Sequence, residues 1–297
     1  MFTIEHVLCP VDFSPSSRRA LGFAVQLWQW FGARISVLYV HRPTIPLFCA
    51  APVAVPSLAD VPMGEQERAG ILAGMERYVA SERALGVPID LVVRDSPKVA
   101  RTIVEVATEI GADVIAMSTE GRSGVRRLLL GSVAEGVLRL ADCPVLTVTP
   151  RLPQLEGDAP ALDRVLCAVE SLEHVESALR HAIALAEMSG ARLTIAHIVR
   201  LPLELVAPDT TLSDQRLVKF REARVRIDAL IASMHPRCPV DPILLAGSPL
   251  TEINRLAAEQ QAGLLVIGGR RAGRKAALRR DLTEQLVRQA PCPVLTV

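Results

Sequence analysis

The first half of the chain contains the stretch Ser118-Thr-Glu-Gly121-Arg-Ser-Gly124-Val-Arg-Arg-Leu-Leu-Leu-Gly131-Ser132-Val-Ala-Glu-Gly136-Val-Leu138. An apolar run at residues 113–117 precedes it, and apolar residues at helical spacing follow Ser132, so a strand passes into a helix here. Glycines let backbone N–H groups approach a ligand, and a helix start carries unpaired N–H groups and the positive end of the helix dipole. The stretch predicts a phosphate site. An ordinary glycine-rich connection with Ser132 as the helix N-cap is the alternative.

Strands and helices alternate around this stretch. We expect strands at residues 6–12, 35–40, 89–94, 113–117 and 145–148, and helices at 15–31, 64–85, 97–110 and 132–141. Ser14 is a good N-cap before Pro15, Gly32 ends that helix, and its buried face should hold Ala20, Leu21, Ala24, Leu27, Trp28 and Phe31. Strict alternation predicts an α/β fold, an open parallel sheet with helices on both faces. We interpret the proline-rich residues 42–62 as decoration, with a lid or an interface as alternatives.

The pattern restarts in the second half. Val165-Leu-Cys167 repeats Val7-Leu-Cys9, residues 190–195 repeat 32–37, and Cys-Pro-Val-Leu-Thr-Val occurs at both 143–148 and 292–297. Three matches in the same order indicate a tandem duplication. We therefore predict two domains, residues 1–150 and 163–297, each with a five-stranded sheet, joined by a proline-rich linker at 151–162.

Composition excludes several classes of protein. The net charge is +1, from 33 basic and 32 acidic residues spread along the chain, so no basic field favours nucleic acid. The six cysteines show no CxxC spacing, which argues against a zinc site or a disulfide framework. The N-terminus does not resemble a signal peptide, and four prolines break the apolar residues 45–62, so we expect a cytoplasmic protein without a membrane span.

Two candidate binding elements follow strands. Asp12 ends the first strand, and the glycine-rich stretch follows the fourth. In a sheet of strand order 3-2-1-4-5 these strands are neighbours where the order reverses, which is where open α/β sheets bind ligands. A carboxylate suits ribose hydroxyls, N–H groups suit phosphates, and the main chain at Val40 suits a base. The alternative for Asp12 is a turn or capping residue.

Both halves resemble universal stress protein domains, whose nucleotide-binding members carry Gly-x2-Gly-x9-Gly-(Ser/Thr). Here the pattern reads Ser118-x2-Gly121-x9-Gly131-Ser132, with serine at the first glycine. The resemblance implies a Rossmann-like fold similar to adenine nucleotide α-hydrolases, and an ATP site with Mg²⁺ as a candidate ion on the phosphates. In that site Asp12 would hold the ribose, Val40 and Met117 would bound the adenine, and the phosphates would contact Gly121, Gly131, Ser132 and Val133. The implied site also includes Pro10, Val11, Ser118 and Arg122.

The groups that efficient hydrolysis needs are missing from the sequence. It contains no Gly-x4-Gly-Lys-(Ser/Thr) loop, no strand-borne Gly-x-Gly-x-x-Gly and no Ser-Gly-Gly-x-Asp-Ser loop. His41 follows the second strand, where a histidine is more often a surface or capping residue than a base. We therefore expect a nucleotide-dependent stress or regulatory protein with at most weak ATP hydrolysis. A slow ATPase or phosphoryl-transfer enzyme, and a scaffold without nucleotide, are the alternatives.

The duplicated site differs between the halves. Alignment places Glu170 at Asp12, Gly268 at Ser118, Arg270 or Arg271 at Gly121, and Arg280-Asp281 at Gly131-Ser132. The longer Glu170 would intrude on the ribose, and Asp281 would put a carboxylate where an anion must sit. We therefore expect one ATP, in the N-terminal domain. The alternative is that arginine side chains grip the phosphates at Arg270, Arg271, Arg274, Arg279 and Arg280.

The matching terminal strands, residues 145–148 and 294–297, are apolar and expected at sheet edges, where unpaired strands invite pairing. Universal stress proteins dimerise through this strand, so the resemblance implies an intramolecular pseudo-dimer of the two domains. Association of whole chains into a homodimer, and the identity of a protein partner, stay open.

Overall fold

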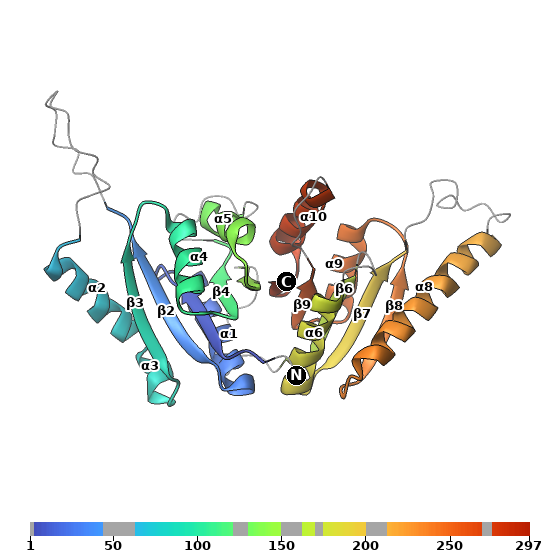
Figure 1. Cartoon of the computed structure of the whole chain (residues 1–297), viewed down its shortest axis with the longest axis horizontal. Helices are drawn as coiled ribbons and strands as arrows, with labels where there is room; N and C mark the ends of the chain where they lie inside the picture. The colour runs from blue at the N-terminus through green and yellow to red at the C-terminus, as the bar shows by residue number, and fades with distance from the viewer. Residues whose placement is uncertain are drawn as a thin grey trace, which may run out of the picture. The chain divides into compact units, whose positions relative to one another are not determined.

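The computed structural model describes residues 3–43, 63–120, 130–149, 162–169, 175–199, 213–268 and 275–297 (Figure 1). The side chains of residues 213–214 and 275–281 fall outside this description. The described chain divides into two compact units, one containing most of residues 4–145 and the other most of residues 146–297. We describe each half by itself.

The first half contains a sheet of order β3-β2-β1-β4-β5. Its strands are β1 (His6–Pro10), β2 (Arg34–His41), β3 (Ile89–Asp95), β4 (Val114–Ser118) and β5 (Val145–Val148). β1 pairs in parallel with β2 and with β4, and β2 pairs in parallel with β3. The α/β fold and the strand order 3-2-1-4-5 are therefore confirmed.

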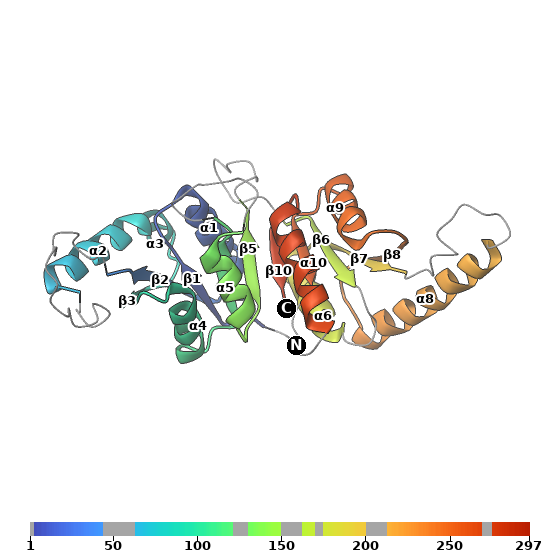
Figure 2. The same cartoon turned by 90° about the horizontal axis from the view of Figure 1, so that it is seen from above.

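Helices cover both faces of this sheet. They are α1 (Pro15–Phe31), α2 (Glu65–Tyr78), α3 (Ala80–Ala84), α4 (Val99–Glu109) and α5 (Ser132–Leu140). Figure 2 shows α1, α2 and α3 on one face and α4 on the other. α5 packs closely on α4, since a Cβ added at Gly136 would lie 2.6 Å from the Ala100 Cβ.

Local signals define α1 as the sequence predicts. The Ser14 hydroxyl accepts a hydrogen bond from the Ser17 N–H at 3.1 Å, Pro15 is the first helical residue, and Gly32 ends the helix with φ of 71°. A positive φ costs glycine little, which explains why the helix stops there. On the predicted apolar face, Ala20, Leu21, Ala24 and Leu27 are buried, whereas Trp28 and Phe31 are half-buried.

The helix predicted over residues 64–85 is divided in the structure. The sequence predicts one continuous helix, but the structure has two, α2 and α3, which are separated at Val79, with φ of −102° and ψ of 7°. The Tyr78 carbonyl accepts a hydrogen bond from the Arg18 guanidinium of α1. This carbonyl thus bonds across to another helix at the point where α2 ends.

The second half repeats the same topology, in the order β8-β7-β6-β9-β10. Its strands are β6 (Arg164–Val169), β7 (Arg192–Ile198), β8 (Val240–Leu245), β9 (Leu264–Ile267) and β10 (Val294–Thr296). Its helices are α6 (Glu176–Ser189), α8 (Ser213–Met234), α9 (Pro249–Glu259) and α10 (Lys275–Gln289). In Figure 2, α6 and α8 cover one face of this sheet and α9 covers the other. Leu162, at the end of the predicted linker, is buried in this half near Gly263.

Candidate functional site

The carboxyl ends of β1 and β2 lie at one edge of the first sheet. Pro10, the last residue of β1, lies opposite Leu38 in a parallel ladder. The ladder extends beyond β1, because the Val11 N–H donates to the Leu38 carbonyl at 2.8 Å. Continuing the same register brings Asp12 level with Val40. The structure therefore brings the predicted ribose and base contacts to one edge.

β4 ends at the same edge on the other side of β1. Met117 is buried, and Ser118 is half-buried. The Ser118 hydroxyl donates to the Glu120 carbonyl at 2.7 Å. The serine that stands at the family's first glycine therefore uses its hydroxyl to close a turn of its own chain.

Gly131 joins the start of α5 to the end of β4. Its N–H donates to the Thr119 carbonyl at 2.8 Å. A Cβ added at Gly131 would lie 2.9 Å from that carbonyl oxygen, a separation that real side chains essentially never show. This close backbone approach is the reason that glycine stands here.

Gly131, not Ser132, is the N-cap of α5. Gly131 has the extended φ of −61° and ψ of 141°, and no side chain caps the helix. The alternative that Ser132 is the N-cap is therefore wrong: Ser132 is the first helical residue and is exposed, with Val133 half-buried beside it. A helix start without a side-chain cap leaves backbone N–H groups for another acceptor, and the helix dipole makes an anion a favourable one.

Two residues of the predicted site, Gly121 and Arg122, lie outside the described residues. The described part of the predicted phosphate site thus consists of both ends of the glycine-rich stretch. These ends are Ser118 with Thr119 on the strand side and Gly131 with Ser132 on the helix side.

The turn after β1 contains an unusual backbone conformation that the sequence did not predict. The Asp12 carboxylate accepts a hydrogen bond from the Ser14 N–H at 3.0 Å. This bond is the one expected if Asp12 is a turn residue, which is the alternative to its role as a ribose ligand. Between Asp12 and Ser14, Phe13 has φ of 63°, in the left-handed region. This conformation costs a residue with a side chain on the order of 1–2 kcal/mol, so contacts elsewhere in the fold must hold it.

His41 lies between two carboxylates at the end of β2. Its Nε2 is 3.3 Å from Glu67 Oε1 and its Nδ1 is 3.4 Å from Asp95 Oδ1. Asp95 Oδ2 also accepts the Met63 N–H at 2.9 Å. These contacts tie β2, β3 and the start of α2 together, which is the structural role that a histidine at a strand end usually has.

Three cysteine thiols are buried in the described ranges. Burial raises the pKa of the Cys9, Cys167 and Cys292 thiols to about 12, so these sulfurs stay protonated at neutral pH. Within the part of the chain that the structure describes, no group of three His, Cys, Asp or Glu side chains is placed to hold a metal ion. No described helix is both long enough and apolar enough to cross a membrane.

The equivalent edge of the second half is built differently. The His197 Nδ1 contacts the Val169 carbonyl at 2.8 Å, at the end of β6. The residues predicted to decide whether this edge binds a nucleotide are not described. Glu170, Arg270, Arg271 and Arg274 lie outside the described residues, and so do the side chains of Arg279, Arg280 and Asp281.

Comparison with known proteins connects this geometry to one family. A family model described as the universal stress protein family matches residues 3–149 and again residues 161–297. A universal stress protein of Methanocaldococcus jannaschii is 31% identical over 149 residues, covering 48% of this chain and 81% of the relative. One from Thermus aquaticus is 33% identical over 143 residues, covering 48% of this chain and 96% of the relative.

A solved structure shares the whole fold. The crystal structure of a universal stress protein from Archaeoglobus fulgidus matches with a TM-score of 0.67 and 21% identity, covering 99% of this chain and 96% of that chain. The likeness therefore includes both halves in tandem.

Proposed function

Because the chain belongs to the universal stress protein family through both of its halves, we propose that it is a cytoplasmic regulatory protein that binds one ATP in its N-terminal half. In this proposal ATP occupancy changes how the protein engages a partner during stress. The proposal assigns the ribose to Asp12, the adenine to the edge between Val40 and Met117, and the phosphates to the start of α5.

The start of α5 carries the proposal. It has no side-chain cap, and Gly131 is held against Thr119 at the end of β4, next to the strand that leads to Asp12. Backbone N–H groups and the dipole of a helix N-terminus suit phosphate, and a carboxylate on the neighbouring strand suits ribose hydroxyls. One nucleotide would span both, with Mg²⁺ as a candidate ion on its phosphates.

Calorimetric titration with ATP tests the binding claim. We expect a stoichiometry near one, and native mass spectrometry of freshly purified protein to show a co-purified adenine nucleotide. A stoichiometry near two would favour the alternative that arginines of the second half grip a second nucleotide. No binding of ATP would favour a scaffold without nucleotide.

Turnover separates a regulatory protein from an enzyme. N–H groups that hold the phosphates equally well in the ground state and the transition state do not accelerate hydrolysis. We therefore expect single-turnover hydrolysis far slower than roughly one per second, a rate within the ordinary enzyme range. A faster rate would replace the regulatory proposal with that of an ATPase or phosphoryl-transfer enzyme that uses the same site.

A further inference from the structure

The strained residue Phe13 directly follows the proposed ribose ligand. Its φ of 63° is rare for a residue with a bulky side chain. Backbone strain persists only where the surrounding structure over-determines it, and such residues cluster at functional sites. Contacts with neighbouring side chains must therefore hold Phe13 in this conformation.

Two tyrosines hold the Phe13 ring. Tyr39 of β2 is stacked on it, with ring centroids 5.0 Å apart and 25° between the planes. Tyr78 of α2 meets it at 5.4 Å with 75° between the planes. Both arrangements are favourable for aromatic pairs. We call Phe13, Tyr39 and Tyr78 the aromatic clamp.

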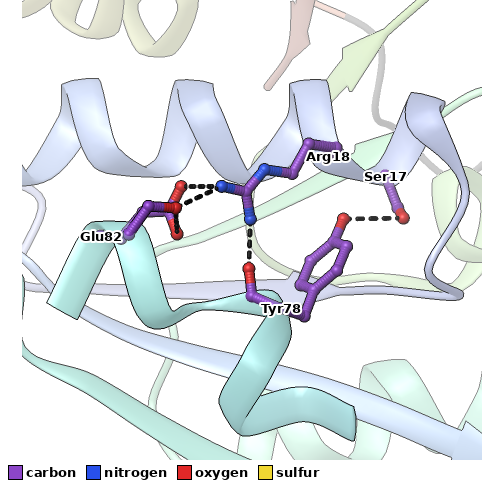
Figure 3. Close-up of polar contacts among 5 residues, drawn as sticks. Ser17, Arg18, Tyr78 and Glu82 are labelled. Carbon is purple, nitrogen blue, oxygen red and sulfur yellow. Dashed lines mark hydrogen bonds and ion pairs between the residues drawn. The ribbon is translucent and has the colours of Figure 1, made fainter. Parts of the chain in front are cut away.

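Tyr78 is itself anchored on α1. Its hydroxyl lies 3.1 Å from the Ser17 Oγ, its carbonyl accepts from Arg18, and the Arg18 guanidinium carbon lies 5.1 Å from the centre of its ring. The Arg18 Nη2 also pairs with Glu82 at 2.5 Å and with the Ser81 hydroxyl at 2.7 Å (Figure 3). The clamp therefore links the turn after β1 to β2, α1, α2 and α3.

We propose that the aromatic clamp positions the Asp12 carboxylate for the ribose hydroxyls of a bound nucleotide, with Tyr78 as a positioning residue on α2. The inference rests on the proposed function. Phe13 is adjacent to Asp12 in the chain, and the Asp12 carboxylate accepts the N–H of Ser14 on its other side. Fixing the Phe13 ring fixes the backbone turn, and the turn sets where the carboxylate points. Because coupling is reciprocal, a nucleotide held by Asp12 also restrains α2 through Phe13 and Tyr78.

The sequence of the second half differs at two of the clamp positions. At the same offset as the repeat, His197 takes the place of Tyr39, and its Nδ1 contacts the Val169 carbonyl. The sequence has Ser171 in the place of Phe13. The clamp thus belongs to the half in which we propose that the nucleotide binds.

The test compares ATP with 2′,3′-dideoxy-ATP, which lacks the hydroxyls that Asp12 would hold. For the wild-type chain we expect calorimetry to show about tenfold tighter binding of ATP, the value of one hydrogen bond to a charged group. Asp12→Ala, which removes the acceptor, sets the lower limit of this ratio of affinities. Phe13→Gly and Tyr78→Leu are expected to reduce the ratio of the ATP affinity to the dideoxy-ATP affinity to within about twofold of that limit. Tyr78→Phe keeps the ring and is expected to reduce the wild-type ratio by less than about threefold.

Phe13→Gly removes the ring contacts without leaving a strained backbone. Glycine adopts the left-handed turn without cost, so this variant relieves the strain while it removes the ring. Phe23→Leu is the matched control, because Phe23 is buried in α1 and is not part of the clamp. It is expected to lose stability but to keep the wild-type ratio. Hydrogen exchange gives a second readout: the Ser14 amide should exchange faster in Phe13→Gly and Tyr78→Leu than in Phe23→Leu.

The outcomes of these measurements distinguish failure of the proposed function from failure of the positioning role. If the wild-type chain binds no ATP, the proposed function fails and this inference fails with it. If the wild-type chain binds both nucleotides equally, the ribose role of Asp12 is refuted, and so is the clamp. If folded Phe13→Gly and Tyr78→Leu keep the wild-type ratio, the proposed function stands and only the positioning role is overturned.

Discussion

The two halves of the chain have the same topology but different residues at the edge where a ligand would bind. Both keep a glycine of positive φ after the first helix, Gly32 with φ of 71° and Gly190 with φ of 75°. At the candidate edge they differ: Phe13 and Tyr39 of the first half correspond to Ser171 and His197 of the second. The shared residues satisfy backbone requirements of the fold. At the candidate edge, the residues that differ include those that would touch or position a nucleotide in the proposed site.

The largest expected effect comes from carboxylates at the start of α5, where the second half has Asp281 in the place of Ser132. Gly131→Asp with Ser132→Asp places carboxylates at the start of α5 and a Cβ 2.9 Å from the Thr119 carbonyl oxygen. Repulsion of phosphate and displacement of the helix start should weaken ATP binding at least about 100-fold, equivalent to roughly 2.7 kcal/mol. Calorimetric titration measures the loss.

Gly64→Asp is the matched control for this pair. Gly64 is the N-cap of α2, and nothing lies within 4 Å of an added Cβ. Aspartate is a favourable N-cap residue, so the control should fold and bind ATP within about twofold of the wild-type affinity. ATP binding that survives the Gly131 and Ser132 changes would place the nucleotide elsewhere, including the second half.

The next prediction concerns whether the halves recognise each other. Expressed separately and mixed, they should form a one-to-one complex, because residues 145–148 and 294–297 repeat the same apolar sequence and are predicted edge strands. Analytical ultracentrifugation measures the association. Thr147→Pro, which removes a backbone N–H on the side of β5 that faces away from β4, should weaken it. Halves that stay monomeric when mixed would contradict the intramolecular pairing.

A moderate effect is expected for the packing of α5 on α4. Gly136→Ala would place a Cβ 2.6 Å from the Ala100 Cβ. Overpacking of this kind usually costs about 1–3 kcal/mol, which urea denaturation would detect as a lower transition midpoint. Gly70→Ala is the control, because nothing lies within 4 Å of its added Cβ and alanine favours a helix. In the second half, Gln285 stands at the position that aligns with Gly136. If Gly136→Ala keeps the wild-type stability, the α4–α5 pair tolerates a side chain at this position as the second half does.

The smallest expected difference between the halves lies in their equivalent thiols. Burial raises the pKa of both Cys9 and Cys167 from 9.0 to about 12. Above pH 9 the unfolded chain ionises these thiols while the folded chain keeps them protonated, so the free energy of unfolding should fall as pH rises from 9 to 12. Each thiol contributes a slope of up to about 1.4 kcal/mol per pH unit.

Alkylation followed by mass spectrometry compares the two thiols directly. At pH 8 both should react only as fast as the protein unfolds, and at equal rates if the halves unfold together. Rapid alkylation of Cys9 alone would show that the first half opens locally near the end of β1.

Local chemistry explains which sequence predictions are confirmed. The boundaries of α1 depend on Ser14, Pro15 and Gly32, which act within one or two residues of themselves, and the structure has them as predicted. The strand order is confirmed because alternation of strand and helix admits few arrangements once crossovers are right-handed. The grouping of Asp12 and Val40 at one edge follows from that order.

Longer-range contacts explain the predictions that are wrong. Residues 64–85 have a continuous helical pattern, but a hydrogen bond from Arg18 reaches the Tyr78 carbonyl where α2 ends. Ser132 is a good N-cap by type, yet the backbone bond from Gly131 to Thr119 makes Gly131 the cap instead. Gly121 and Arg122 remain predictions.

The duplicated α/β fold, the family and the edge at which the candidate site lies can all be predicted from the sequence, because periodicity, helix signals and repeats depend on residues close together in the chain. The contacts that hold that edge are visible only in the folded protein. The left-handed turn at Phe13 and its contacts with Tyr39 and Tyr78 join residues from three separate elements. No local propensity favours a phenylalanine with positive φ, since the contacts that compensate for its strain exist only when β2 and α2 are in place.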